Sequence, residues 1–161
     1  MGRQKNKVDL AYIAGFLDGD GSIFFQVKKR KDSSRGRRLM FTICFYQDIR
    51  HEKPLFWIRE VLEIGYISHR SDGITELRIN GYKQIREILI LLYPYLRFKK
   101  EQAKLISQVL DILVLKNINQ LTITEKKKIA NALLRSRRLS YQSGKKKMDK
   151  TRKDIAEILS F

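Results

Sequence analysis

Two aspartates separated by one glycine stand at the end of an apolar segment, where they could bind a hard cation. Residues 13–21 read IAGFLDGDG. If this segment is a helix, its last carbonyls carry partial negative charge, which disfavours an acid there by roughly 0.3–1 kcal/mol. A divalent cation reverses that balance, because carboxylates and free carbonyls then serve together as ligands. The pattern indicates either a Mg²⁺ site that activates water for attack on a phosphate, or a glycine C-cap with an incidental acidic turn.

Other catalytic signatures are missing from the sequence. It contains no Walker-type phosphate loop and no Gly-x-Ser-x-Gly elbow. The single cysteine, Cys44, excludes an internal disulfide and a cysteine-cluster metal site. His51 and His69 are too isolated for a zinc site, so we interpret His69 as a hydrogen-bonded sheet residue and His51 as a surface residue.

The charge of the chain points to a polyanionic partner. The sequence has 34 Lys and Arg against 17 Asp and Glu, a formal charge of +17 over 161 residues. Hydrophobic residues make up 43%, which allows one compact domain. No apolar run approaches the roughly 18 residues of a membrane span, and the first residues lack the apolar stretch of a signal peptide. We therefore expect a soluble, intracellular protein that binds nucleic acid and no membrane.

Hydrophobic periodicity predicts an α+β domain. Apolar residues recur at helical spacing in residues 7–19, 54–63, 83–92 and 100–115, with Gly65 as the stop signal of the second helix. Apolar and polar residues alternate in residues 22–31 and 37–47, and again in 66–70 and 74–80 on either side of Asp72-Gly73. The order helix, hairpin, helix, hairpin and then helices predicts one four-stranded antiparallel sheet.

Small residues form a stripe along the first predicted helix. Ala11, Gly15 and Gly19 recur at every fourth position. Glycine inside a helix costs about 1 kcal/mol relative to alanine, so the stripe requires an explanation. It indicates a close approach to another helix or to the chain's own sheet, or else a chance arrangement.

The C-terminal third is predicted to be helical but less compact. Residues 125–139 form a helix with Thr124 as its N-cap, residues 140–150 form a Lys-rich linker or mobile arm, and residues 151–161 form a last helix. We divide the chain into a core domain, 1–139, and a basic linker with a C-terminal helix, 140–161, packed on the core or extending it.

Residues 13–21 resemble the motif of the LAGLIDADG homing endonucleases, with Ile13 for the first leucine and Gly19 for the usual alanine. The order of elements resembles that family's fold through about Leu115, and residues 94–102 resemble its Pro-aromatic-Leu…Lys segment. The motif occurs once, so the resemblance is to single-motif members, which act as homodimers with their motif helices side by side. It implies a homing-endonuclease-like fold and a dimer interface that contains Ala11, Tyr12, Gly15, Phe16 and Gly19.

The resemblance also implies a catalytic set. Asp20, with the Gly19 carbonyl, would bind Mg²⁺ or another divalent cation such as Mn²⁺ or Ca²⁺. Gln47 matches a position that orders water around the metal. Lys99 matches a lysine that stabilises charge at the scissile phosphate, with Lys100 as the alternative if the register shifts by one.

Two further positions near the motif are interpreted differently. Asp18 lies two residues before Asp20 and so points elsewhere on the helix, and we interpret it as structural. The family often has a basic residue near position 51. Here that residue is His51, beside Arg50, and the departure leaves this role open.

The outward face of both hairpins is then the predicted surface for reading DNA. A two-stranded ribbon fits the major groove, where Arg, Lys and Gln make bidentate contacts and apolar side chains touch thymine methyls. Phe24, Met40 and Cys44 are candidates for the apolar contacts, and the lysines of residues 145–153 for contacts to phosphate. A solvated sheet face is the alternative. The complete predicted set is Phe24, Gln26, Lys28, Arg30, Arg35, Arg37, Arg38, Met40, Thr42, Cys44, Tyr46, Tyr66, Ser68, Arg70, Glu76 and Arg78.

The leading prediction is a homodimeric, Mg²⁺-dependent endonuclease that cuts double-stranded DNA at a long, nearly palindromic site and leaves short 3′ overhangs. The resemblance implies an intron-encoded origin, in an organelle or a prokaryotic cytoplasm. Two alternatives remain, a maturase that binds intron RNA and a non-catalytic DNA-binding regulator on the same fold. The presence of Asp20, Gln47 and Lys99 favours the nuclease, because neither alternative requires them.

Overall fold

The computed structural model describes residues 5–29, 36–140 and 144–160. Its helices are α1 Lys7–Asp20, α2 Lys53–Leu62, α3 Tyr82–Leu92, α4 Lys100–Leu113, α5 Ile123–Arg138 and α6 Lys145–Leu159. Its strands are β1 Gly21–Lys29, β2 Arg37–Asp48, β3 Tyr66–His69 and β4 Ile74–Asn80. The described residues also form 3₁₀ turns: η1 Ile49–His51 between β2 and α2, η2 Tyr93–Tyr95 between α3 and α4, and η3 Ile118–Gln120 between α4 and α5. The predicted α+β fold is confirmed.

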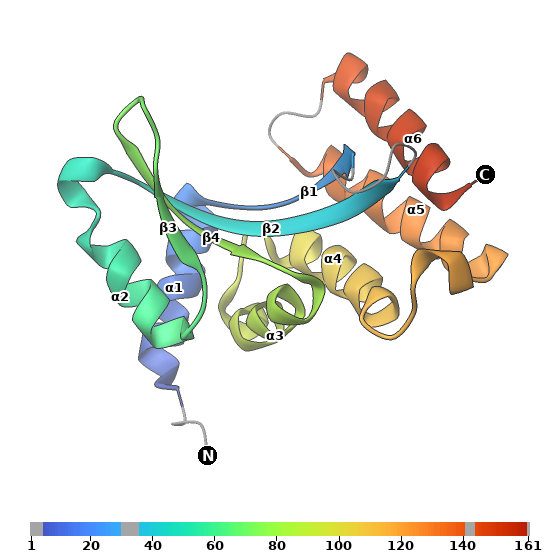
Figure 1. Cartoon of the computed structure of the whole chain (residues 1–161). Helices are drawn as coiled ribbons and strands as arrows, with labels where there is room; N and C mark the ends of the chain where they lie inside the picture. The colour runs from blue at the N-terminus through green and yellow to red at the C-terminus, as the bar shows by residue number, and fades with distance from the viewer. Residues whose placement is uncertain (1–4, 30–35, 141–143, 161) are drawn as a thin grey trace.

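The four strands form one antiparallel sheet in the order β1-β2-β4-β3. The sheet bends in a broad arc, with α1, α3 and α4 packed beneath it and α5 and α6 packed around the right-hand end of β1 and β2 (Figure 1). Because side chains alternate along a strand, each strand presents one row to these helices and the other row to the opposite face. The opposite face is the one on which DNA contacts are predicted.

One face of α1 belongs to the hydrophobic core. Leu10, Ile13 and Leu17 are at most 6% exposed and join the cluster that includes Phe41 and Phe45 of the sheet. Full burial of such a side chain stabilises the fold by roughly 1.5–3 kcal/mol. The core therefore fixes the position of α1 against the sheet, and with it the position of the acids at the end of α1.

Two glycines are required by local geometry. Gly73 has φ +80° in the β3–β4 turn, as the Asp72-Gly73 pattern predicts. Gly21 follows α1 so closely that a Cβ there would lie 2.8 Å from the Leu17 Cα. The chain can therefore pass directly from the helix into β1 only with glycine at this position.

Three predicted boundaries were wrong. Helix α2 ends at Leu62, and its C-cap is Glu63 in the left-handed conformation with φ 57°, rather than the predicted Gly65. Helix α5 is capped by Thr122 rather than Thr124, because Thr122 and Glu125 form a reciprocal capping box. Helix α6 begins at Lys145, inside the predicted linker, because Met148 and Thr151 are already buried against the rest of the chain.

Candidate active site and DNA-reading face

The fold brings the three predicted catalytic residues to one end of the sheet. Helix α1 ends at Asp20, and β1 starts at the next residue. Gly21 pairs with Phe45, so Gln47 lies on β2 just beyond the start of β1. Lys99 immediately precedes α4 and is bonded to the last turn of α1. Asp20, Gln47 and Lys99 thus come from three separate segments that meet at the C-terminus of α1.

Asp20 is exposed at this end of α1. Within the described part of the chain, its carboxylate forms no hydrogen bond or ion pair, although its charge acts on Lys99. An exposed carboxylate without an internal partner is available to a ligand, and exposure removes much of the penalty for an acid at a helix C-terminus.

Lys99, rather than Lys100, faces the acids. The Lys99 ammonium donates to the Asp18 carbonyl at 2.5 Å and is half-buried. Burial lowers the pKa of Lys99, while Asp18 and Asp20 act in the opposite direction. The Lys100 ammonium instead lies 5.1 Å from the centre of the Tyr93 ring. The structure therefore favours the first of the two predicted registers.

Gln47 is half-buried, and its side-chain carbonyl accepts a hydrogen bond from the Asp48 amide at 2.9 Å. This bond fixes the side chain and leaves its NH₂ group to donate to water or phosphate. His51 is exposed on η1. Its neighbour Arg50 is tied to Asp48 by two side-chain hydrogen bonds of 2.9 Å, which hold the pKa of Asp48 well below its usual range.

A divalent cation fits this site only in part when one chain is considered. The described residues contain no group of three or more His, Cys, Asp or Glu side chains that could hold a metal. Mg²⁺, however, keeps several waters and takes one or two carboxylates together with substrate phosphates. Asp20 and the neighbouring Gly19 carbonyl would supply that kind of incomplete oxygen set, with water and substrate phosphate as further ligands.

Most of the predicted DNA contacts lie on the open face of the sheet. Gln26, Lys28, Arg38, Tyr66 and Arg70 are exposed. Five others are half-buried among them, namely Phe24, Met40, Tyr46, Ser68 and Arg78. Arg30 and Arg35 lie outside the described residues.

Three predicted contacts are buried beneath their neighbours. Thr42 is 1% exposed, Cys44 0% and Glu76 6%. Thr42 and Cys44 lie on β2, which is flanked by β1 and β4, and Glu76 lies on β4, which is flanked by β2 and β3. Cys44 therefore cannot reach a thymine methyl in this conformation, and burial raises the pKa of its thiol to about 11. Thr42 instead donates to the Asn80 side chain at 2.7 Å.

Glu76 organises two arginines on the open face. Its carboxylate accepts hydrogen bonds from Arg78 at 2.9 Å and from Arg70 at 3.4 Å. The Nε of Arg78 is buried without a partner among the described atoms. Glu76 is thus a support for guanidinium groups rather than a contact to DNA.

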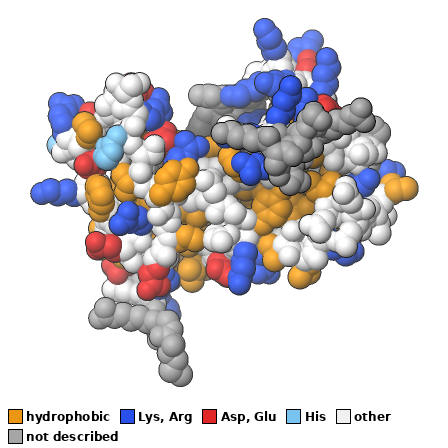
Figure 2. All heavy atoms as spheres, in the orientation of Figure 1, with side chains coloured by type: hydrophobic (Ala, Val, Ile, Leu, Met, Phe, Trp, Pro, Cys, Tyr) orange, Lys and Arg blue, Asp and Glu red, His pale blue; other side chains and the backbone are white. Residues whose placement is uncertain are grey.

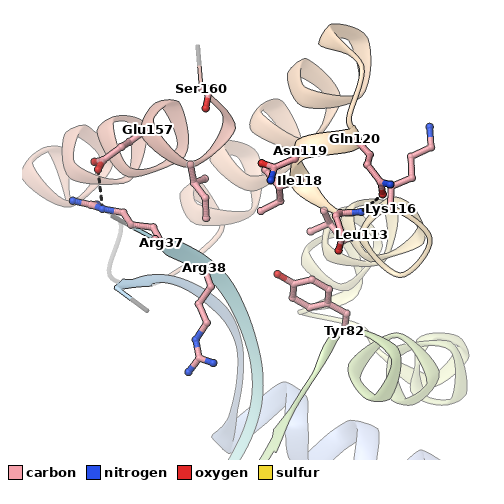
Figure 3. Close-up of a pocket in the computed structure, with 13 residues that line it drawn as sticks. Arg37, Arg38, Tyr82, Leu113, Lys116, Ile118, Asn119, Gln120, Glu157 and Ser160 are labelled. Carbon is pink, nitrogen blue, oxygen red and sulfur yellow. Dashed lines mark hydrogen bonds and ion pairs between the residues drawn. The ribbon is translucent and has the colours of Figure 1, made fainter. Parts of the chain in front are cut away.

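Arg37 is also engaged within the chain. It lies 2.9 Å from Asp154 and 2.9 Å from Glu157, both on α6. These ion pairs engage the Arg37 guanidinium within the chain, and its contact to DNA stays a prediction. Arg37 borders a cavity of about 830 Å³ that also lies against Tyr82 and the end of α4 (Figure 3). Since Arg37 pairs with Lys29 at the far end of the hairpin from Gly21, this cavity is remote from Asp20.

The small-residue stripe faces away from the rest of the chain. Ala11, Tyr12, Gly15 and Gly19 are exposed, and a Cβ added at either glycine would meet nothing within 4 Å. The chain's own sheet therefore does not explain these glycines. Phe16, also predicted in the interface, is half-buried, with its ring centre 6.1 Å from that of Phe45.

Sequence reasoning missed two supports of the site. The Ser22 and Tyr46 hydroxyls lie 2.9 Å apart across β1 and β2. Gln102 is 9% exposed and donates to the Ile23 carbonyl at 2.8 Å, which ties α4 to β1. The only available signal for Gln102 was its place in the PYLRFKKEQ segment.

A profile described as LAGLIDADG endonuclease matches residues 13–109, the region that contains the second half of α1, the sheet and most of α4. The chain belongs to the LAGLIDADG endonuclease family. It is 30% identical over 105 residues to DNA endonuclease I-CvuI of Chlorella vulgaris, a match that covers 65% of this chain and 65% of that protein. It is 29% identical to DNA endonuclease I-CreI of Chlamydomonas reinhardtii over 69% of this chain and 68% of that one.

Solved structures of homing endonucleases share the fold over nearly the whole chain. The homing endonuclease I-CvuI in complex with its target in the presence of Ca superposes with a TM-score of 0.74 and 25% identity, covering 94% of this chain and 95% of that one. The archaeal intron-encoded homing endonuclease I-Vdi141I complexed with DNA gives 0.72 and 20% identity over 94% and 96%. The profile match ends within α4, whereas each of these two structural matches covers 94% of the chain.

Proposed function

We propose that this chain is a site-specific homing endonuclease that acts as a homodimer and makes double-strand breaks in a long, nearly palindromic DNA target. The observation that carries the proposal is the meeting of Asp20, Gln47 and Lys99 at the exposed end of α1. The relatives named as DNA endonucleases support it. Short 3′ overhangs and an intron-encoded origin remain predictions from family resemblance.

The chain's own residues would divide the work at each scissile phosphate. Asp20 and the Gly19 carbonyl would hold Mg²⁺, whose chemistry is to lower the pKa of bound water and to stabilise the leaving oxygen. The NH₂ group of Gln47 would orient the attacking water. The Lys99 ammonium would donate to the phosphate as negative charge develops there, in a partly dry site where such a contact is strong.

The open face of the sheet would read the target. Arg70 and Arg78, held by Glu76, offer fixed guanidinium groups of the kind that recognise guanine in the major groove. Gln26, Lys28 and Arg38 extend this surface along the first hairpin. Lys and Arg side chains also gather over α6 at the upper right of Figure 2, where contacts to phosphate would add affinity without sequence preference.

A second copy of the chain would complete the active unit. Close packing of two α1 helices explains Gly15 and Gly19, which have no packing role inside one chain. A two-fold axis between the helices would place the two Asp20 residues near each other, one for each DNA strand. It would also supply the second carboxylate that a single chain lacks.

The direct test is to incubate purified protein with a randomised double-stranded DNA library, with and without Mg²⁺, and to sequence the broken ends. The proposal predicts double-strand breaks at one long motif that depend on the divalent cation. The affinity for that motif should fall with salt at a log–log slope near −0.9 per phosphate contact. Tight sequence-specific binding without breaks would indicate a regulator, and selective binding of intron RNA alone would indicate a maturase. Either result would contradict the proposal.

A further inference from the structure

Asp18 joins the end of α1 to the start of α4. It is 6% exposed, and its carboxylate accepts backbone hydrogen bonds from Arg97 at 2.6 Å, Phe98 at 3.2 Å and Lys99 at 2.9 Å. The two segments are distant in the sequence, since 81 positions separate Asp18 from Lys99. These bonds confirm the interpretation of Asp18 as structural. They also show that the segment held by Asp18 is the one that carries Lys99.

Asp18 also contacts the Lys99 side chain. The Asp18 carbonyl accepts the hydrogen bond from the Lys99 ammonium at 2.5 Å. One residue of α1 therefore holds both ends of Lys99, the backbone amide through its carboxylate and the ammonium through its carbonyl. A carboxylate that accepts several N–H groups is held firmly, because each charge-assisted bond is about twice as strong as a neutral one.

Side-chain packing does little to fix residues 97–99. Arg97 is exposed and Phe98 is 81% exposed, so neither side chain anchors the segment in the core. The nearest buried anchors are Leu96 before it and Gln102 after it. The backbone bonds to Asp18 are consequently the principal restraint on where Lys99 sits relative to Asp20.

We propose that Asp18 is a positioning residue for the cleavage reaction, which acts by setting the place of Lys99 beside the Asp20 carboxylate. The proposal rests on the endonuclease function proposed above. A displacement of about 1 Å in a reacting group can cost roughly 100-fold in rate. Loss of the Asp18 carboxylate should therefore slow cleavage far more than it weakens binding to the target.

The test compares wild-type protein with Asp18→Asn, Lys99→Met and the double variant on a target selected by the wild type. Single-turnover cleavage rates are measured in Mg²⁺, and equilibrium Kd values without divalent cation. We expect Asp18→Asn to lower the rate about 100-fold with Kd changed less than about threefold. In the Lys99→Met background, the same substitution should lower the rate less than about threefold, because the group that it positions is already absent. The matched control is Asp111→Asn on α4, which removes an exposed ion pair with Arg86 of α3 and should leave the cleavage rate and Kd unchanged.

Each outcome decides the proposal. Equal fold losses in the wild-type and Lys99→Met backgrounds, or a rise in Kd that accounts for the lost activity, would overturn it. If Asp18→Asn does not yield folded protein by circular dichroism, Asp18→Ser, which keeps one acceptor, is measured in the same cycle. Absence of cleavage by the wild type would overturn the proposed function as well. Cleavage by the wild type with an unchanged rate in Asp18→Asn would overturn this inference alone.

Discussion

The two faces of α1 are built from the same short stretch of sequence but serve different surroundings. The inward face presents Leu10, Ile13 and Leu17 to the core. The outward face presents Ala11, Gly15 and Gly19, and a side chain added at either glycine would meet only open space. The residues of the inward face are explained by packing within one chain. The residues of the outward face have no such packing, which agrees with the proposed second copy.

The same contrast separates the two aspartates of the motif. Asp18 is buried and its carboxylate is fully engaged by backbone amides, whereas Asp20 is exposed and has no hydrogen-bonding partner among the described residues. A buried acid satisfied by N–H groups stabilises the fold. An exposed acid at an unfavourable helix end contributes nothing to the fold, and is therefore expected to act on a ligand.

Substitution of the exposed acid should give the largest effect on activity. We expect Asp20→Asn to lower the cleavage rate by about 10³-fold, because the proposed metal site would lose the carboxylate that Asp20 supplies. The free energy of unfolding should change by less than about 0.5 kcal/mol, as is usual for a surface residue. Single-turnover cleavage and urea unfolding measure the two quantities. A large loss of stability would show that Asp20 stabilises the fold, as Asp18 does, and would contradict the contrast drawn between them.

Removal of an inward side chain should act on stability instead. Ile13 is 0% exposed, so Ile13→Ala is expected to lower the free energy of unfolding by about 2–5 kcal/mol. Urea unfolding followed by circular dichroism measures the loss. The control is Val8→Ala on the same helix, where a 73% exposed residue should cost less than about 0.5 kcal/mol. A cost below about 1 kcal/mol for Ile13→Ala would contradict the placement of α1.

Addition of a side chain to the outward face should act on association. Gly15→Leu is expected to weaken the dimer about 100-fold or more, because two bulky groups would meet at the close approach of the helices. Each chain should remain folded, since leucine favours a helix by about 0.5–1 kcal/mol over glycine. Sedimentation velocity across a concentration series measures the dimer. Gly15→Ala is the smaller matched change, and its dimer affinity should lie between those of the wild type and Gly15→Leu. An undiminished dimer would show that the stripe is not the interface.

The smallest effects should distinguish neighbouring arginines at the far end of the first hairpin. Arg38 is exposed on the open face, and Arg38→Gln should weaken target binding about fivefold to tenfold with stability unchanged. Arg37 pairs with α6, so Arg37→Gln should cost about 0.5–1 kcal/mol of unfolding free energy with binding unchanged. Fluorescence anisotropy measures target binding, and thermal unfolding measures stability. The reverse pattern would restore Arg37 as a DNA contact.

Local patterns in the sequence predicted most of the core fold. Alternation predicted both hairpins and which residues of β2 face the core, because the two-residue period follows directly from strand geometry. It did not predict that Cys44 and Thr42 are buried on the open face, since that depends on which strands lie on either side of β2. The Thr122 cap was missed because two threonines stand two residues apart, and only the bond to Glu125 distinguishes them.

Interactions between distant segments could not be predicted from the sequence. The identity of Asp20, Gln47 and Lys99 as one site came from resemblance to the family, and the structure then placed them at one end of the sheet. The bonds from Asp18 to residues 97–99, and from Arg37 to Asp154 and Glu157, join segments that no local pattern relates. Burial of Met148 likewise decided that α6 begins within the Lys-rich stretch.

The central claim is that the active unit is a pair of chains, with one Asp20 required from each. Mixed dimers of wild-type and Asp20→Asn chains, purified through two different affinity tags, test it most directly on the selected target. We predict double-strand cleavage at least about 100-fold slower than that of the doubly tagged wild-type dimer, because one half-site lacks its carboxylate. Cleavage of both strands at the wild-type rate by the mixed dimer would contradict the claim.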